Sequence, residues 1–242
     1  MTRGIIIAGN ESPLLSALGA EAVKRVTGCA AALIPHGTGG ERLEDGRQAE
    51  DGKQTKNGEN SLTFLDWNPA SPVSTRTLVL AARNRLEHID EALLVCVPPS
   101  CRRPPEELAP AEIDRLVDYN IKSWFFLVRE LAAVFKKRAA AKNAERPDGT
   151  AGTLVLILKD INAGIRDDLP DLAGPPIAAA FRSFAQGLLI SAAKAPYTVT
   201  AFSSQEAGEE AAFAAYVFKT LEDEKRNGGK WHKYGKTGFF GR

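Results

Sequence analysis

Short runs of continuous apolar residues alternate with helical segments along the chain, and this alternation limits the possible fold more than any other feature. The apolar runs are Gly4–Ala8, Cys29–Ile34, Leu62–Leu65, Ala92–Val97, Thr153–Leu158 and Tyr197–Phe202. Strands that are apolar on both faces are typical of a parallel sheet with helices on each side. The sequence therefore predicts an α/β fold with a doubly wound, Rossmann-like parallel sheet of about seven strands.

Helical periodicity fills the intervals between these runs. Helices are expected over 13–26, 74–85, 110–137, 177–194 and 206–224, and the segment 230–242 could place a seventh strand at the sheet edge. In 110–137, large apolar residues recur at spacings of three and four after Pro110. A length of 242 residues with 44% hydrophobic content suits one domain over residues 1–242.

Residues 36–61 interrupt this pattern because they are rich in glycine and charge and almost free of large apolar side chains. Such a segment cannot bury enough surface to offset the entropy lost on ordering. We expect a flexible surface loop. One hypothesis is that it captures a protein partner, in which case deleting 36–61 would abolish capture and leave the thermal midpoint almost unchanged.

Charge and composition exclude several classes of function. The net charge of +1 gives no general attraction to nucleic acid or to an anionic membrane. No apolar stretch reaches the roughly 18 residues that span a bilayer. Three widely spaced cysteines and the absence of a charged leader before the first strand predict a reduced, cytoplasmic protein. The three histidines lack the spacing of a metal site, so no metal is expected.

The order and spacing of several segments resemble the short-chain dehydrogenase/reductase (SDR) family over essentially the whole chain. IIIAGNESPLL lies where that family has a strand followed by TGxxxGxG, and DEALLVCVPP resembles the segment that ends in NNAG. LVDYNIKSWFFLVREL resembles the helix with the family's catalytic asparagine, which falls on Asn120, and GTLVLILKDINAG resembles the strand that ends in the catalytic serine. The resemblance implies a Rossmann-type domain that binds NAD(P).

Two cofactor-binding residues follow from this resemblance. Gly9 corresponds to the first glycine of the motif, and Asp66 corresponds to the acid that binds adenine after the third strand. Pro13 and Leu15 fall where the other two glycines would lie, so an N–H donor is lost and bulk is added. Gly9 also suits a plain tight turn, and Asp66 also suits the start of a turn with Asn68. The cofactor is therefore undetermined, with NAD(P) as the candidate despite a degraded motif.

The family's Tyr-x-x-x-Lys proton-transfer pair is missing. Around the expected positions stand only side chains that cannot exchange a proton: Pro175, Pro176, Ile177, Ala179, Ala180 and Phe181. The serine position falls near Leu158 or Lys159. Two weak catalytic candidates remain: Asn120, which could instead form a structural hydrogen bond, and Lys159, which could form a binding pair or a solvated ion pair with Asp160.

Two classes of function account for these observations. A divergent SDR-like protein without catalysis, with a structural, regulatory or ligand-binding role, explains each missing group. The alternative is an NAD(P)-dependent oxidoreductase with a non-standard site, in which Lys159, Tyr119 or Tyr197 donates the proton. The family pairs the counterparts of 111–137 and 177–194 in a four-helix bundle and packs its last strand at an interface. The resemblance therefore implies a homodimer or homotetramer.

Overall fold

The centre of the molecule is one parallel sheet. The computed structural model describes residues 3–25, 28–34, 62–141, 150–160, 170–223 and 228–235. Its seven strands have the order β3-β2-β1-β4-β5-β6-β7, and every neighbouring pair is parallel. They are β1 (Gly4–Asn10), β2 (Gly28–Ile34), β3 (Leu62–Leu65), β4 (Glu91–Cys96), β5 (Thr153–Lys159), β6 (Thr198–Ser204) and β7 (Trp231–Tyr234). The strand order reverses between β1 and β4, which confirms the predicted doubly wound Rossmann-like class.

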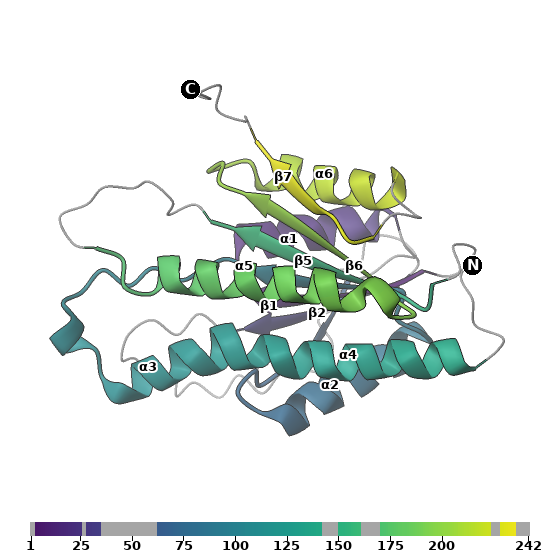
Figure 1. Cartoon of the computed structure of the whole chain (residues 1–242), viewed down its shortest axis with the longest axis horizontal. Helices are drawn as coiled ribbons and strands as arrows, with labels where there is room; N and C mark the ends of the chain where they lie inside the picture. The colour runs from purple at the N-terminus through teal and green to yellow at the C-terminus, as the bar shows by residue number, and fades with distance from the viewer. Residues whose placement is uncertain are drawn as a thin grey trace.

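Helices cover both faces of the sheet (Figure 1). Helices α1 and α6 pack together on one face, while α2, α4 and α5 cover the other. The helices are α1 (Pro13–Val23), α2 (Pro72–Leu86), α3 (Pro110–Val117), α4 (Ser123–Ala140), α5 (Gly174–Ser191) and α6 (Glu210–Asp223). Short single turns occur at η1 (Pro105–Glu107), η2 (Asp118–Lys122) and η3 (Ala192–Lys194).

The sheet divides the core into two apolar layers. Successive residues of a strand point to opposite faces, so Ile5 and Ile7 enter the layer under α1 and α6, whereas Ile6 and Ala8 enter the layer under α2, α4 and α5. All four side chains are buried. The continuous apolar runs in the sequence therefore reflect burial on both faces of a covered parallel sheet.

Several helix boundaries differ from the sequence prediction. The helix expected over 110–137 is divided into α3, one π-helical turn at η2, and α4. The Asn120 amide donates to the carbonyl of Leu116 at 3.1 Å, and the Ser123 hydroxyl donates to that of Tyr119 at 2.6 Å. Side chains that bond to carbonyls one turn back favour such irregularity. Periodicity alone did not reveal it because the apolar spacing continues through the turn.

Other predictions concern the ends of the chain and its loops. The predicted seventh strand is present as β7 at the sheet edge, and residues 236–242 of the predicted segment lie outside the described residues. The loop expected at 36–61 lies outside the described residues. Within the described part of the chain, no helix has the length and apolar character that crossing a bilayer requires.

Candidate functional site

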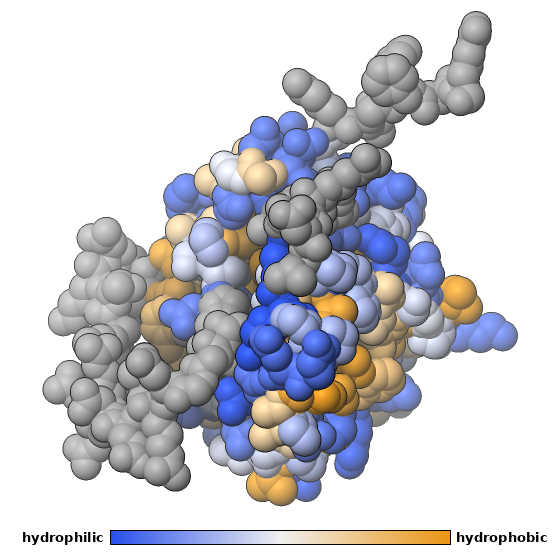
Figure 2. Space-filling model, turned by 90° about the vertical axis from the view of Figure 1, so that its left-hand side faces the viewer, coloured by the Kyte–Doolittle hydropathy of each residue, from blue (hydrophilic) through white to orange (hydrophobic). Residues whose placement is uncertain are grey.

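The carboxyl ends of the parallel strands meet at one edge of the sheet, which is the usual ligand-binding edge of a doubly wound fold. Figure 2 views this edge, with apolar surface gathered toward the lower right, on the side of α4 and α5. Asn10 ends β1, Lys159 ends β5 and Ser204 ends β6, so polar groups from distant parts of the sequence gather here. These groups and the two adjoining helix N-termini define the candidate site.

Asn120 takes part in a buried chain of hydrogen bonds between β1 and the π-helical turn. Its side-chain oxygen accepts a hydrogen bond from the Asn10 amide at 3.0 Å, and its own amide donates to the Leu116 carbonyl. The Asn10 oxygen in turn accepts from the backbone N–H of Val97 at 3.4 Å, and the Asn120 carbonyl accepts from the Trp124 indole. These bonds satisfy the amide that the sequence placed in an apolar helix.

Gly9 lies inside β1, and it does not form the tight turn that the sequence also allowed. A Cβ atom at this position would lie 2.1 Å from the Val95 carbonyl oxygen on β4, and its φ is not in the left-handed region. The close approach of two central strands therefore explains this glycine without a bound phosphate. Its predicted role in cofactor binding stays a prediction.

The start of α1 offers few donors for a pyrophosphate. Pro13 has no N–H, the N–H of Leu15 donates to the Ser12 hydroxyl at 3.2 Å, and that of Ser16 donates to the Ser12 carbonyl. Among the described residues, only the N–H of Leu14 in this first turn has no partner. Leu14 and Leu15 are both buried in the layer under α1 and α6. This turn fits the phosphates of NAD(P) less well than a glycine-rich turn, because Pro13 has no N–H and the N–H groups of Leu15 and Ser16 already have partners.

Asp66 follows β3 and is exposed. No hydrogen bond or ion pair joins it to another described residue, and the adjacent turn is stabilised by Asn68, whose side chain accepts from the N–H of Ala70 at 3.1 Å. The next residue, Trp67, is buried and donates its indole N–H to Thr75 at 3.0 Å. Asp66 is exposed, and among the described residues nothing around it selects adenine, so this role also stays a prediction.

Lys159 and Asp160 do not form the solvated ion pair that the sequence favoured. Lys159 is only 2% exposed, and its ammonium lies 3.3 Å from the Glu210 carboxylate at the start of α6 and 6.0 Å from the centre of the Phe213 ring. Asp160 pairs instead with Arg182 of α5 at 3.3 Å. Adjacent residues at a strand end point to opposite faces, so they reach different helices. Sequence adjacency was a poor guide here.

Glu210 is a charged partner for the buried ammonium. The backbone N–H of Glu210 itself, with help from Lys159, holds the pKa of this carboxyl below its ordinary value, although burial opposes the shift. The pair connects the end of β5 to the first turn of α6. Lys159 therefore has a structural contact that explains its position, and its weak candidacy as a catalytic group is untested.

The first two turns of α5 contain no side chain that can transfer a proton. They consist of Gly174, Pro175, Pro176, Ile177, Ala178, Ala179, Ala180 and Phe181. The helix N-terminus is occupied by Asp171, whose carboxylate accepts from the N–H groups of Ala173 and Gly174, each at 3.0 Å, and of Cys101 at 2.9 Å. Burial alone would raise the pKa of Asp171, but these donors outweigh it, so the pKa lies below the ordinary value. The carboxylate thus stabilises the helix end that would otherwise attract an anion.

The two tyrosines considered as proton donors lie in different places. Tyr197 immediately precedes β6 at the opposite edge of the sheet, where its ring contacts Phe135 with centroids 5.8 Å apart. Tyr119 adjoins Asn120 in the π-helical turn and packs against the core. Only Tyr119 therefore lies next to the candidate site. In the described part of the chain, no group of three or more His, Cys, Asp or Glu side chains could hold a metal ion.

Several site residues were not singled out from the sequence. Asn10 is the last residue of β1 and directly follows a glycine, and Asp171 accepts from the N–H groups two and three residues ahead of it, as aspartate commonly does in turns. Both carried a local signal that could have been used. Glu210 and Arg182 carried none, because their partners are determined by which helix packs over the end of β5.

Comparisons with known proteins show which solved structures share this architecture. No family model matches the chain, and no curated protein matches it. Among solved structures, a short-chain dehydrogenase from Mycobacterium smegmatis is similar with a TM-score of 0.68 and 12% identity, over 98% of this chain and 93% of that one. An NADH-dependent reductase A1-R' complexed with NAD is similar with a TM-score of 0.65 and 16% identity, over 96% of this chain and 95% of that one. A short-chain dehydrogenase/reductase from Serratia marcescens has a TM-score of 0.60 and 17% identity, over 96% of this chain and 95% of that one.

These likenesses extend over nearly the full length of each chain, so the protein has the fold of the short-chain dehydrogenases. At such low identity they show the fold and no more, because one fold supports many functions. The protein therefore has an SDR-like, Rossmann-type fold.

A double-mutant cycle tests the structural role of Asn120. Asn120→Ala leaves the Asn10 amide buried without its acceptor, so we expect the free energy of unfolding to fall by about 1–3 kcal/mol. Asn10→Ala should have a similar effect, and the double variant should lose clearly less than the sum of the two. Urea unfolding measures each value. The exposed Asn84→Ala on α2 is the control, and strictly additive losses at Asn10 and Asn120 would contradict a direct coupling.

Proposed function

We propose that this protein is a divergent member of the SDR family that does not catalyse hydride transfer and acts as a structural, regulatory or ligand-binding protein. The observation that carries the proposal is the start of α5, where eight successive residues offer no proton donor or acceptor. Proton transfer to the substrate oxygen requires a side chain of suitable pKa within hydrogen-bonding reach. The full-length likeness in fold supports the family, and the altered site supports the loss of its chemistry.

The state of the remaining polar groups agrees with this proposal. Asn10 bonds to Asn120, Lys159 pairs with Glu210, and Asp160 pairs with Arg182. Groups that are paired in this way stabilise the scaffold, whereas catalytic groups are aimed at a substrate. The few free donors at the start of α1 further support a site without the dinucleotide. An oxidoreductase with a non-standard site is the alternative, and nucleotide binding and turnover decide between the two.

Thermal unfolding with nucleotides tests the proposal. We expect NAD, NADH, NADP and NADPH, each at about 1 mM, to leave the unfolding midpoint unchanged. A ligand that binds only the folded state at 100 times its Kd would add about 2.7 kcal/mol and raise the midpoint by several degrees. A catalytically active short-chain dehydrogenase is the positive control for the assay.

A saturable rise in the midpoint would show that a nucleotide binds and would favour the oxidoreductase alternative, and turnover of NADH or NADPH with a panel of carbonyl substrates would then contradict the proposal. Asp66→Ala would then show whether binding follows the family's mode, because the resemblance places Asp66 against adenine. Asp114→Ala, an equally exposed aspartate on α3, is its matched control. Loss of the rise in Asp66→Ala alone would identify the adenine site.

We also propose that two copies of the chain associate through the outer faces of α4 and α5. Phe125 is 57% exposed and its ring lies 4.7 Å from that of Phe184, while Ile190 is 78% exposed on α5. Large apolar side chains exposed together on adjoining helices favour an interface. Light scattering at micromolar concentration should give a dimer or tetramer, and Phe125→Glu should convert it to monomers. Phe64→Glu on β3 is the control, and a monomeric wild type would exclude this association.

A further inference from the structure

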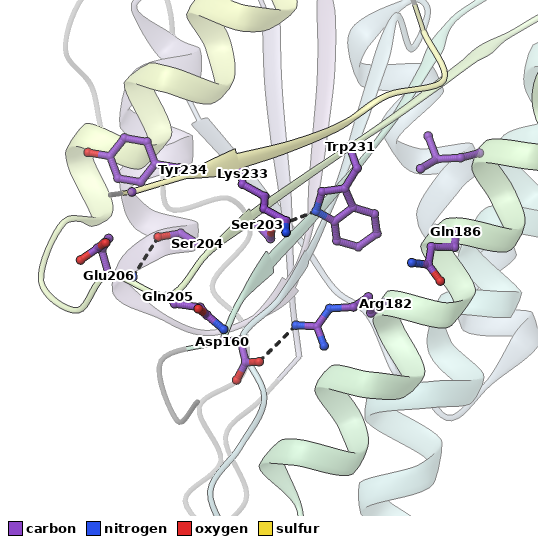
Figure 3. Close-up of a pocket in the computed structure, with 12 residues that line it drawn as sticks. Asp160, Arg182, Gln186, Ser203, Ser204, Gln205, Glu206, Trp231, Lys233 and Tyr234 are labelled. Atoms are coloured by element: carbon purple, nitrogen blue, oxygen red, sulfur yellow. Dashed lines mark hydrogen bonds and ion pairs between the residues drawn. The ribbon is translucent and has the colours of Figure 1, made fainter. Parts of the chain in front are cut away.

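A hollow of about 1020 Å³ lies between α5 and the edge formed by β6 and β7 (Figure 3). Asp160 and Ser204, at the ends of β5 and β6, line it, so the hollow extends from the candidate site along α5 to β7. Binding sites for small molecules typically have volumes of roughly 300–1,000 Å³ and combine apolar walls with a few polar groups. The polar groups here come from three different elements, α5, β6 and β7.

Trp231 supplies the aromatic wall. Its indole N–H donates to the Ser203 hydroxyl on the neighbouring strand at 2.8 Å, which holds the ring in place and satisfies its polar atom. Figure 3 shows the ring between β7 and α5, with Arg182 and Gln186 on the facing helix. The ring is partly buried against the core and lines the hollow, and an indole whose N–H is satisfied can stack with a planar ring in an offset arrangement.

Arg182 supplies a charged group with donors to spare. One of its terminal nitrogens lies 3.3 Å from Asp160, and the side chain as a whole remains 41% exposed. A guanidinium has five N–H donors in a planar fork that matches a carboxylate. The contact with Asp160 leaves most of this fork without a partner among the described residues.

Lys233 adds a second cation to the same hollow, and no ion pair joins it to another described residue. Asp160 and Glu206 also line the hollow, so its walls are close to neutral overall. Asp160 occupies only one nitrogen of Arg182. The N–H groups that remain available to a ligand are therefore those of Arg182 and Lys233. A ligand with one negative charge would be held by these two groups, whereas both carboxylates of the hollow are already engaged, Asp160 with Arg182 and Glu206 in a contact of its own.

We propose that this hollow binds a planar aromatic carboxylate, whose ring stacks on Trp231 and whose carboxylate is bound by Arg182 and Lys233. This inference does not require that catalysis is lost, because its contacts come from Trp231, Arg182 and Lys233, none of which lies in the first two turns of α5. Binding here together with turnover of NADH or NADPH would refute only the non-catalytic proposal. Absence of both binding here and turnover would refute only this one.

The indole N–H signals of the protein provide a direct measurement by two-dimensional ¹H–¹⁵N NMR. Of the three tryptophans, Trp67 and Trp124 are buried and bonded to Thr75 and to the Asn120 carbonyl, so their signals are internal references. Trp231→Phe assigns the third signal. Titration with indole-3-carboxylate to about 10 mM should shift the Trp231 signal saturably and leave the other two almost unchanged.

Two ligand analogues and three variants define the contacts. Indole-3-carboxamide lacks the charge and cyclohexanecarboxylate lacks the flat ring, and each should bind at least about tenfold more weakly. Arg182→Gln should weaken indole-3-carboxylate by at least about tenfold, and Arg182→Lys should be intermediate because it keeps the charge without the fork. Arg129→Gln changes an exposed arginine on α4 and should leave binding unchanged.

Two results would overturn the proposal. One is the absence of a saturable shift of the Trp231 signal up to about 10 mM indole-3-carboxylate, which would mean that any Kd is weaker than about 10 mM. The other is a shift that persists undiminished in Arg182→Gln or with the carboxamide. Circular dichroism of each variant distinguishes a lost contact from a lost fold.

Discussion

Replacing Gly9 by alanine is expected to lower the free energy of unfolding by about 3 kcal/mol. The added Cβ would lie 2.1 Å from the Val95 carbonyl oxygen and 2.8 Å from the Val95 Cβ, so β1 and β4 would have to move apart. Both are central strands, packed on each face, and a close-packed core responds to extra volume with strain. Equilibrium unfolding in urea measures the loss.

Gly187→Ala is the matched control for this substitution. Gly187 lies within α5, and a Cβ there would meet nothing within 4 Å. Because alanine favours the helix more than glycine does, this variant should be more stable by about 0.5–1 kcal/mol. If Gly9 were needed only for the approach of a phosphate, Gly9→Ala would unfold like the wild type, and that result would contradict the packing explanation.

Asp90→Ala is expected to lower the free energy of unfolding by about 3–5 kcal/mol. Asp90 immediately precedes β4 and is buried, and its carboxylate accepts from the N–H of Gly4 at 2.9 Å and from Arg138 of α4 at 2.9 Å. It also lies 3.1 Å from the ring nitrogen of His88. Removing one partner from a buried ionic network leaves the others desolvated and unpaired, which is the costly case.

Two further variants make this prediction specific. Asp90→Asn keeps an acceptor for the N–H of Gly4 and should lose less stability than Asp90→Ala. The exposed Asp66→Ala should change the free energy of unfolding by no more than about 0.5 kcal/mol. Urea unfolding measures the free energy of unfolding of each variant, and its dependence on urea concentration should stay unchanged. A loss below about 1 kcal/mol in Asp90→Ala would show that water replaces the carboxylate at this edge.

Asp90 and Asn120 lie at opposite ends of the parallel strands and form different kinds of hydrogen bond. At the amino edge, Asp90 joins β1, β4 and α4 through charged hydrogen bonds. At the carboxyl edge, Asn10 and Asn120 join β1 to the π-helical turn through neutral ones. In an active dehydrogenase the carboxyl edge is where groups must remain free for ligands. In this protein Asn10 is bonded to Asn120 and Lys159 is paired with Glu210 at that edge, and this pairing supports the non-catalytic proposal.

The candidate site could be predicted only in part. Asn120 was identified because an amide in an apolar helix needs a partner, and the structure supplies Asn10. Lys159 was identified from its position at a strand end, but its solvated pairing with Asp160 was wrong because strand residues alternate between faces. Trp231 was not singled out and lay only within the segment 230–242 that was expected to form the seventh strand. Its contact with Ser203 depends on the register of β7 against β6.

The sequence by itself determined the class of fold, because continuous apolar strands and periodic helices carry their burial pattern in local order. It also determined the absence of proton-transfer side chains at the start of α5, since residue identity alone decides that point. Only the tertiary structure decided that Gly9 is required by Val95, that Asp171 occupies the helix end, and that Lys159 and Asp160 pair with different helices. Such contacts join residues far apart in the chain, and their geometry depends on the packing of whole elements, which local sequence does not encode.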